Sequence, residues 1–458
     1  MTPSPNATGG AGSGDGPVPL SRPRRALLAL CAGQVVAAAV ALGVVAGSSP
    51  GRPGGPAGST QTGGSGGRGA PTVIAAQHLL DRHGAALLAR DRTAFLADLD
   101  ASPAAARYRA AQAATFDNVA GVPLAAWSYR ITAPVTGGSV LADAAGRYGT
   151  AILIARVAFR YQLRDADPAP TAHDVWLTFV RRSGRVLVAS DADLVGEGGA
   201  SWHGPWDFGR VVARRGAASL VLAHPADDAR LAGVAEVADN AVAAVSGVWG
   251  SGWSRRAVVI VAGSQDEMRA ITGATGGSDP AAETVADDAD ASTGLRVVIN
   301  AAQISRLSVV GLRLVVRHEV THVATWALTQ ASQTLPTWLI EGLADYVANL
   351  GSGQPVTVAA GELRAEVASG KIPAALPAND EFTRGGTRLP QVYEEAWLAC
   401  RLIAARAGQD ALVRLYRRVA TSAGSPQATL DAALRGTLSL STAQFTARWR
   451  QYVRTELA

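Results

Sequence analysis

The sequence predicts an α+β protein with a membrane helix near its N-terminus and a largely helical C-terminal half. A predominantly apolar run from Ala26 to Ala46 predicts the membrane helix. Between residues 71 and 200, stretches with helical periodicity precede shorter runs that are typical of strands. From Ser305 onwards most of the chain has helical periodicity. The 458 residues, 48% of them hydrophobic, are enough for two or three domains with their own cores.

The N-terminal region predicts attachment to a membrane. Residues 1–25 are rich in Gly, Pro and Ser, so we expect a disordered cytoplasmic tail. The run 26–46 has Gln34 as its one clearly polar side chain and is long enough to cross a bilayer. Arginines cluster at Arg22–Arg25 and are sparse after the run, which places the N-terminus inside the cell and the remainder outside. A cleaved signal peptide, giving a secreted protein, is the alternative.

The next part combines a linker and an accessory unit. Residues 47–70 are a Gly/Ser/Pro linker, and residues 71–200 form the first α+β unit. We expect helices over Val73–Leu99 and Ala104–Phe116. The expected strands are Trp127–Thr132, Gly149–Leu163, Val175–Arg181 and Arg185–Ser190. Helices followed by an antiparallel sheet resemble a cystatin-like or nuclear-transport-factor-like domain, which implies a spacer or docking role.

Residues 201–458 form the second unit. Its expected strands are Ser219–Leu222, Val258–Ala262 and Gly294–Asn300, and its expected early helices are Asp228–Val248 and Gln265–Ile271. Residues Gly273–Thr293 are polar and Gly/Asp-rich, so we expect a loop. Asp287, Asp288 and Asp290 in this loop suggest calcium, but the pattern of a calcium loop is missing and a solvated loop is favoured. The expected closing helices are Trp397–Arg406, Gln409–Thr421 and Thr442–Thr455.

The motif His318-Glu319-Val320-Thr321-His322 lies in the expected helix that begins near Ser305. Residues four apart lie on one face of a helix, so His318 and His322 can direct their imidazole nitrogens at one metal ion. Glu319 lies close to that ion but is turned enough to hold a proton instead of binding. The flanking residues are mostly apolar, which predicts a buried helix, and buried polar side chains need partners.

A catalytic zinc ion usually has three protein ligands and leaves a fourth position for water. Glu341 is the expected third ligand, because 341 − 322 = 19 residues allow one helix to end and a second to return. Pro336 suits the first turn of that second helix and Gly351 suits its C-terminal cap. Asp345 lies one turn after Glu341, where it can accept the outer N–H of a zinc-bound histidine.

The sequence H-E-V-T-H, followed by P-T-W-L-I-E-G-L-A-D-Y, resembles the gluzincin metallopeptidases, the group that contains thermolysin and the aminopeptidase-N-like enzymes. Within this group it is similar to the peptidase-MA-like branch of actinobacterial membrane proteins. The resemblance implies a zinc peptidase with His318, His322 and Glu341 as ligands, Glu319 as general base and Asp345 supporting a ligand histidine. The strong motifs cover Val316–Tyr346, and looser similarity extends over much of the chain after Trp202.

The oxyanion formed during peptide hydrolysis needs a hydrogen-bond donor. No histidine follows His322, so the downstream histidine of thermolysin has no counterpart and a tyrosine must serve. The candidates are Tyr346, Tyr393, Tyr416 and Tyr452. Tyr393 is preferred, because the run Val392–Leu398 resembles the tyrosine-headed helix of aminopeptidase-N-like enzymes.

The strand before the zinc helix gives an expectation about substrates. In gluzincins this edge strand lines the substrate cleft, where its backbone can pair with an extended peptide, and Gly294–Asn300 is placed like it. Aminopeptidase-N-like enzymes bind the free amino terminus of the substrate through a glutamate of this strand. Because Gly294–Asn300 has no glutamate, we expect an endopeptidase in preference to an aminopeptidase.

The expected function is therefore extracellular hydrolysis of a peptide or protein substrate with Zn²⁺ as cofactor. Nucleic acid is not an expected partner, since the net charge is only +5 and no basic stripe with interleaved aromatic residues is present. One alternative is a non-catalytic surface module that keeps a zinc site for binding or assembly. Another is a membrane-tethered regulator in which residues 71–200 bind a partner and the peptidase site is vestigial.

Overall fold

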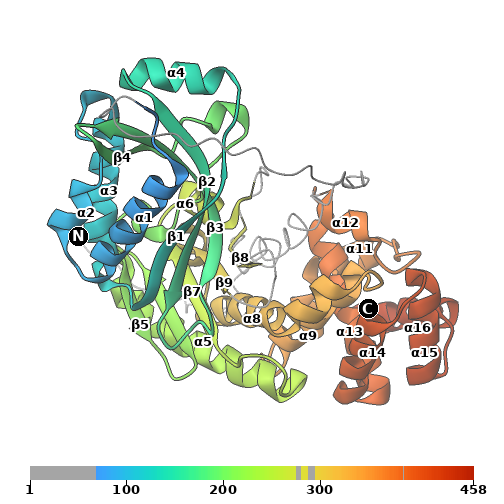
Figure 1. Cartoon of the computed structure of the whole chain (residues 1–458). Helices are drawn as coiled ribbons and strands as arrows, with labels where there is room; N and C mark the ends of the chain where they lie inside the picture. The colour runs from blue at the N-terminus through green and yellow to red at the C-terminus, as the bar shows by residue number, and fades with distance from the viewer. Residues whose placement is uncertain (1–68, 275–279, 287–293, 385) are drawn as a thin grey trace, which may run out of the picture.

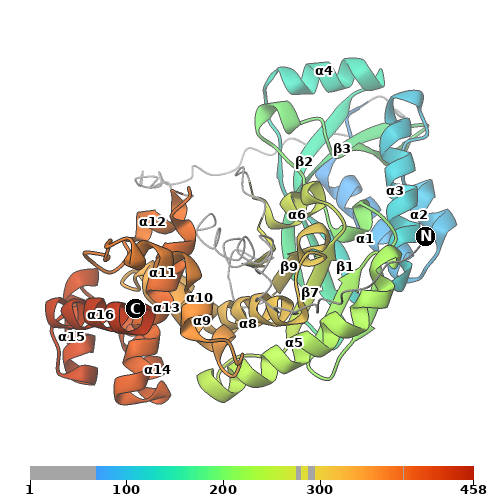
Figure 2. The same cartoon turned by 180° about the vertical axis from the view of Figure 1, so that it is seen from behind.

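The computed structural model describes residues 69–274, 280–286, 294–384 and 386–458, which form two β-sheets and a set of helices (Figure 1). The helices of the C-terminal half lie beside the two sheets (Figures 1 and 2). This arrangement confirms the mixed α+β class and the helical C-terminal half. The predicted cytoplasmic tail, the membrane helix 26–46 and residues 47–68 of the linker lie outside the described residues, as do Asp287, Asp288 and Asp290.

The first sheet is antiparallel, with its strands in sequence order. The strands are β1 (Leu124–Pro134), β2 (Ile152–Leu163), β3 (Thr171–Arg182) and β4 (Arg185–Ser190). The helices of this part are α1 (Val73–Leu88), α2 (Arg92–Ala97), α3 (Ala106–Asn118) and α4 (Ser139–Tyr148). The predicted helix Val73–Leu99 is two helices, because Arg90 adopts a φ of 59° and the Asp91 side chain caps α2. The sequence analysis missed α4.

The two faces of the first sheet carry different cores. Because side chains alternate along a strand, Trp127, Phe159 and Leu177 share one face, where they join the apolar side chains of α1 and α3. Ile154 and Val180 lie on the opposite face and pack with α4. Helices therefore cover this sheet on both faces.

The second sheet has the strand order β5-β6-β7-β9-β8. Its strands are β5 (Val212–Arg215), β6 (Ser219–Ala223), β7 (Ala257–Ala262), β8 (Ala282–Ala286) and β9 (Leu295–Asn300). The inner strands β6, β7 and β9 are parallel, and both edge strands are antiparallel to their neighbours. The helices of this part are α5 (Asp228–Trp249), α6 (Gln265–Thr272) and α7 (Ala301–Ile304).

The expectation that Gly294–Asn300 is the edge strand is wrong. This run forms β9, which lies between β7 and β8, so its backbone is paired on both sides. The edge strand is β8, which lies within the run Gly273–Thr293 that was expected to be a loop. A short strand in a polar run gives little periodicity, and its pairing with β9 is set by the fold rather than by local sequence.

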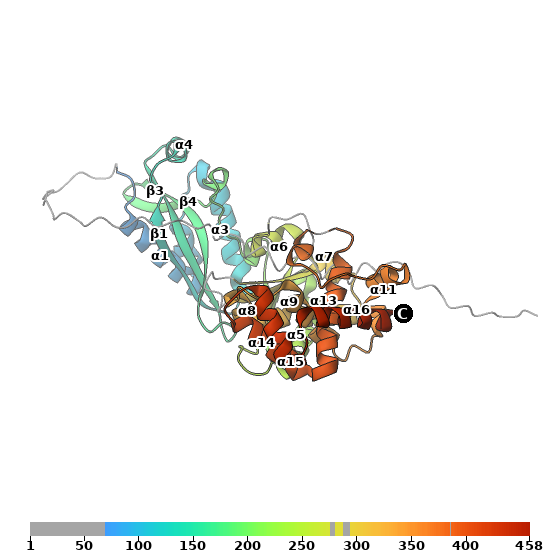
Figure 3. The ribbon, with the colours of Figure 1, turned by 90° about the vertical axis from the view of Figure 1, so that its right-hand side faces the viewer.

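A continuous apolar core joins the two sheets across the predicted boundary between residues 200 and 201. Leu220, Leu222, Val258, Ile260 and Val298 of the second sheet belong to the same buried cluster as the side chains of the first sheet. The opposite face of the second sheet packs on α5 and on the helices that follow. Figure 3 shows the first sheet at one end of the molecule and the C-terminal helices at the other.

Helix α5 is the one helix among the described residues that is long and apolar enough to cross a membrane, over Leu231–Trp249. However, Val234, Ala238, Ala241 and Val245 of this helix are buried in the core against the second sheet, and Figure 2 shows α5 along that sheet. The burial of this side identifies α5 as a core helix of the fold.

The C-terminal part is helical throughout. Its helices are α8 (Val309–Ala331), α9 (Thr337–Asn349), α10 (Val356–Ala359), α11 (Gly361–Ala368), α12 (Asn379–Thr383), α13 (Leu389–Ala407), α14 (Gln409–Thr421), α15 (Pro426–Leu438) and α16 (Thr442–Leu457). The predicted helix Gln409–Thr421 has the observed bounds. Helix α13 begins at Leu389 with Pro390 in its first turn, well before the predicted Trp397, and α15 was not predicted.

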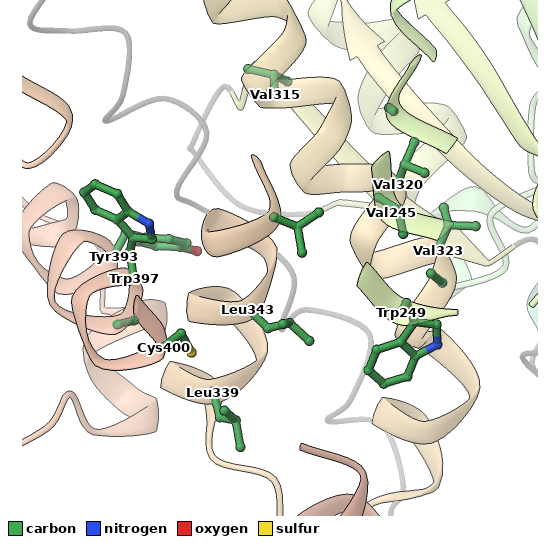
Figure 4. Close-up of a cluster of buried hydrophobic side chains, with 14 of the residues drawn as sticks. Val245, Trp249, Val315, Val320, Val323, Leu339, Leu343, Tyr393, Trp397 and Cys400 are labelled. Carbon is green, nitrogen blue, oxygen red and sulfur yellow. The ribbon is translucent and has the colours of Figure 1, made fainter. Parts of the chain in front are cut away.

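Helix α9 lies between α8 and α13 (Figure 4). Leu339 and Leu343 of α9 belong to the cluster that also contains Val320 and Val323 of α8. On its other side α9 approaches α13 so closely that a Cβ atom at Gly342 would lie 2.3 Å from the Ala396 backbone oxygen. Gly342 therefore sets the distance between these two helices.

We predict that Gly342→Ala lowers the free energy of unfolding by about 1–3 kcal/mol, because the new methyl group meets backbone atoms that cannot rotate away. Thermal and urea unfolding of the variant and the wild-type protein would measure this loss. The matched control is Gly146→Ala in the exposed part of α4, where a Cβ meets nothing within 4 Å and a slight gain in stability is expected. Equal stability of the two variants would contradict the close approach of α9 and α13.

Candidate metal centre

Two consecutive helices carry the predicted ligands. His318, Glu319 and His322 lie in the middle of α8, and Glu341 lies in α9. Helix α8 begins at Val309, four residues after the predicted start, because the Ser308 hydroxyl accepts a hydrogen bond from the Gly311 backbone N–H at 3.1 Å. The turn between the helices allows α9 to return along α8, so residues far apart in sequence meet at one point.

The ends of α9 agree closely with the sequence prediction. Pro336 caps the helix at its N-terminus, one residue before its first turn, and the helix ends at Asn349. Gly351, the predicted C-terminal cap, has a φ of 65° directly after the C-cap residue Leu350. A left-handed glycine at this position is the usual way to end a helix.

The structure brings the three predicted ligands together in a buried group. The Nε2 atoms of His318 and His322 lie 3.3 and 3.4 Å from Oε2 of Glu341 and 3.0 Å from each other. The three side chains are at most 3% exposed, and their ligand atoms all lie within 4.8 Å of one another. Such a group can hold a metal ion.

The donor atoms lie close enough together to share one metal ion. Within the described residues, the buried Oε2 atom of Glu341 has no hydrogen-bond partner, although a buried carboxylate oxygen is costly to leave unsatisfied. Two imidazoles and one carboxylate are also a known donor set of catalytic zinc. The residues present therefore fit a zinc ion.

Asp345 has the predicted supporting position. Its Oδ1 atom lies 2.8 Å from Nδ1 of His318, where it can accept the Nδ1–H bond, and this tautomer is the one in which the neutral imidazole offers Nε2 to a metal ion. Burial alone would lower the pKa of His318, but Asp345, Glu341 and Glu319 together raise this pKa well above its usual value. For Glu341, burial acts to raise the pKa, but the two histidines outweigh it and lower the pKa to about 2.

Glu319 lies beside this group and contacts the edge strand of the second sheet. The Thr284 hydroxyl of β8 lies 2.7 Å from Oε2 of Glu319 and 3.0 Å from its backbone oxygen. The neighbouring Glu283 is buried, and burial, followed by the charge of Glu319, raises the pKa of Glu283 to about 8. This shift favours the protonated form of Glu283.

The sequence analysis missed Thr284 and Glu283, because both fall in the run that was expected to be a loop. The run Ala282–Ala286 does not alternate between polar and apolar side chains, and Gly-rich and Asp-rich residues flank it, so its sequence carried no signal for a strand.

Tyr393 lines a pocket together with His318 and Asp345, whereas His322, Glu341 and Glu319 are not among its lining residues. The pocket next to His318 and Asp345 is also lined by Tyr393, Glu394 and Trp397 of α13. Figure 4 shows Tyr393 and Trp397 on α13, which lies next to α9. The expectation that Tyr393 heads its helix is wrong, because α13 begins at Leu389 and Tyr393 lies in its second turn.

Two of the other candidate tyrosines are engaged elsewhere. The hydroxyl of Tyr416 lies 2.7 Å from that of Thr329 inside the core, where burial raises its pKa to about 12. The hydroxyl of Tyr452 accepts a hydrogen bond from Arg401 at 2.8 Å. Tyr346 is half-buried and packs against the apolar core. Of the four, Tyr393 alone lines the pocket beside His318 and Asp345.

No known family model matches the chain, and no curated protein matches it either. The assignment of this site therefore depends on the geometry and chemistry of its own residues.

We predict that Asp345→Asn weakens zinc binding by about ten- to a hundredfold, because the amide no longer fixes the tautomer and orientation of His318. Competition with a fluorescent zinc chelator would measure the affinity, with His322→Ala as the reference for loss of a ligand. The matched control is Asp410→Asn on the exposed side of α14, which should bind zinc like the wild-type protein. Unchanged affinity in Asp345→Asn would contradict its supporting role.

Proposed function

We propose that this protein is a zinc-dependent metallopeptidase that hydrolyses peptide bonds in peptide or protein substrates. The observation that carries the proposal is the buried group of His318, His322 and Glu341 with Glu319 beside it. Burying two carboxylates and two imidazoles at one point costs free energy, and neither a purely structural helix pair nor a solvated helix face requires it. Three ligands plus one open position is the pattern of catalytic zinc rather than of structural zinc.

Each residue of the centre has a definite task in this proposal. Bound zinc supplies Lewis acidity and lowers the pKa of a water molecule. Glu319 accepts the proton of the attacking water and later donates it to the leaving amine. Because Thr284 holds one carboxylate oxygen of Glu319, the other oxygen is left for this proton transfer. Tyr393 donates its O–H to the oxyanion that develops on the scissile carbonyl.

The edge strand β8 is the proposed docking site for the substrate backbone. Among the described residues it pairs with β9 alone, so its outer edge can pair with an extended peptide. Its residue Thr284 contacts Glu319, which brings this edge to the catalytic base. Pairing through the backbone gives affinity with little demand on the substrate sequence.

The argument that favoured an endopeptidase over an aminopeptidase no longer holds. That expectation depended on the absence of a glutamate in Gly294–Asn300, but the edge strand is β8 and it carries the buried Glu283. We therefore propose hydrolysis of peptide bonds without restriction to internal ones.

For localisation we propose a single-pass cell-membrane protein with the metal centre outside the cell, on the basis of the run Ala26–Ala46 and its flanking arginines.

We predict that Glu319→Gln keeps its zinc but lowers the rate of peptide hydrolysis by about a hundred- to ten-thousandfold, since the amide cannot accept a proton. Zinc content and cleavage of a quenched fluorescent peptide library would be measured on the same preparation. The matched control is Glu236→Gln on the exposed face of α5. Retained turnover in Glu319→Gln would exclude the assigned base, and zinc binding without any wild-type cleavage would favour the non-catalytic binding module.

We predict that Thr284→Val lowers kcat by about ten- to a hundredfold with KM and zinc content nearly unchanged, because the base loses the hydrogen bond that orients it. Valine has nearly the shape of threonine, so the change removes little beyond the hydroxyl group. Thr284→Ser keeps the hydroxyl and should restore most of the rate. An equal loss in both variants would show that packing at β8 matters, and not the hydroxyl.

A further inference from the structure

The first α+β unit contains a second pocket, which shares no residue with the metal centre. One wall is α3, from which Tyr108 and Thr115 project on one face of the helix. The opposite wall is the face of the first sheet that carries Trp127 and Phe159. The segment after β4, which includes Asp191, closes the pocket. Its cavity volume of about 50 Å³ has room for a few water molecules or one small group.

The walls of this pocket are mainly aromatic. Trp127 of β1 lies 4.6 Å from the ring of Phe159 and 5.1 Å from that of Trp206, measured between ring centroids. Trp202 lies 6.0 Å from Phe159 and 6.0 Å from Trp206, so the rings form one continuous wall. Tyr129 of β1 adds a further ring at 5.2 Å from Phe159. Ring faces of this kind attract cations.

The charged groups of the pocket are mostly acidic. Asp191, Asp207 and His203 line it, and no lysine or arginine does so among the described residues. Asp207 is fully engaged, because Thr115 and the Gly204 backbone donate hydrogen bonds to it at 2.7 and 3.0 Å. The nearby His203 interacts with the same carboxylate at 3.6 Å.

Asp191 differs from Asp207 in the hydrogen bonds that its carboxylate accepts. Across the described residues, no other residue donates a hydrogen bond to the Asp191 carboxylate, and no arginine or lysine pairs with it. Burial raises its pKa, which His203 opposes and the charge of Asp207 reinforces. The Tyr108 hydroxyl likewise has no hydrogen-bond partner within the described part of the chain, and the charges of Asp191 and Asp207 act on it. The pocket thus holds a half-buried carboxylate and a hydroxyl that make no hydrogen bond to another residue within the described part of the chain, and His203 is the positively chargeable group near the carboxylate.

We propose that this pocket binds an organic ammonium ion, with Asp191 as its counter-ion and the aromatic wall around its alkyl groups. A quaternary or alkyl ammonium ion combines a positive charge with apolar surface, which matches a carboxylate surrounded by rings. A metal cation would lack the apolar surface, and an anion would meet two carboxylates. The ammonium group can belong to a free amine or to a lysine side chain of a polypeptide, because the recognised chemistry is the same.

Choline and its neutral carbon isostere 3,3-dimethyl-1-butanol provide the test, because the two differ mainly in charge. Each compound is titrated into the full-length protein at constant ionic strength, and the intrinsic tryptophan fluorescence, to which Trp127, Trp202 and Trp206 of the pocket contribute, is followed. We expect saturable binding of choline and at least about tenfold weaker binding of the alcohol. Equal affinity for both compounds, or no saturable signal with choline, would overturn the proposal.

Variants locate the binding site within the chain. Asp191→Asn should weaken choline binding about tenfold and leave the affinity for the neutral alcohol unchanged. The matched control is Asp143→Asn on the exposed side of α4, which should bind choline like the wild-type protein. Thermal unfolding checks that Asp191→Asn is folded, and the comparison of choline with the alcohol needs no variant. Unchanged choline binding in folded Asp191→Asn would also overturn the proposal.

Titrations with two further compounds identify the source of the ammonium group. A variant of the metal centre then tests whether the pocket binds independently of the proposed peptidase site. Butylammonium represents a free amine, and Nα-acetyl-lysine N-methylamide represents a lysine in a polypeptide. Tighter binding of either one supports the ammonium site and names its source, whereas binding of neither, together with no choline binding, contradicts it. His322→Ala should bind choline like the wild-type protein, so the result does not depend on the proposed peptidase activity.

Discussion

The buried carboxylates at the meeting point of α8 and α9 are the constraint on which the site depends. Glu341 and Glu319 lie almost fully inside the protein, where an unpaired negative charge is costly. Two imidazoles offset part of this charge, and the Asp345 carboxylate adds to it. A divalent cation at the point where Nε2 of His318, Nε2 of His322 and Oε2 of Glu341 converge would balance the charges that the fold has buried there.

The second sheet holds the base of this centre in place. Strand β8 contacts Glu319 through Thr284, and β8 is itself fixed by its pairing with β9. Strand β9 is anchored in turn to the first unit, because the fully buried Arg296 donates hydrogen bonds to both carboxylate oxygens of Asp167, at 2.7 and 2.8 Å. One arginine thus links the strand next to β8 with the turn between β2 and β3. Breaking such a buried pair leaves an uncompensated charge in the core.

The parts of the site that could be predicted are those that depend on local spacing. The positions of His318, His322, Glu341 and Asp345 follow from helical periodicity, which the sequence carries within a few turns. The positions of Thr284 and Glu283 could not be predicted, because the order of strands in a sheet depends on contacts between distant segments. The pair of Arg296 and Asp167 was missed for the same reason. In the fold, most helices and strands were found, but β5, β8, α4, α7, α10, α11, α12, α15 and the start of α13 were not.

The shared core also bears on the role of residues 71–200. A spacer that only holds a catalytic domain away from a membrane would need little contact with it, and the two would be joined by an exposed linker. Here the face of the second sheet that carries Leu222, Ile260 and Val298 is covered by the first unit. Removing that unit would expose this apolar face and leave Arg296 without its partner. The first unit is therefore part of the framework that positions β9, β8 and Glu319, as well as the carrier of a pocket of its own.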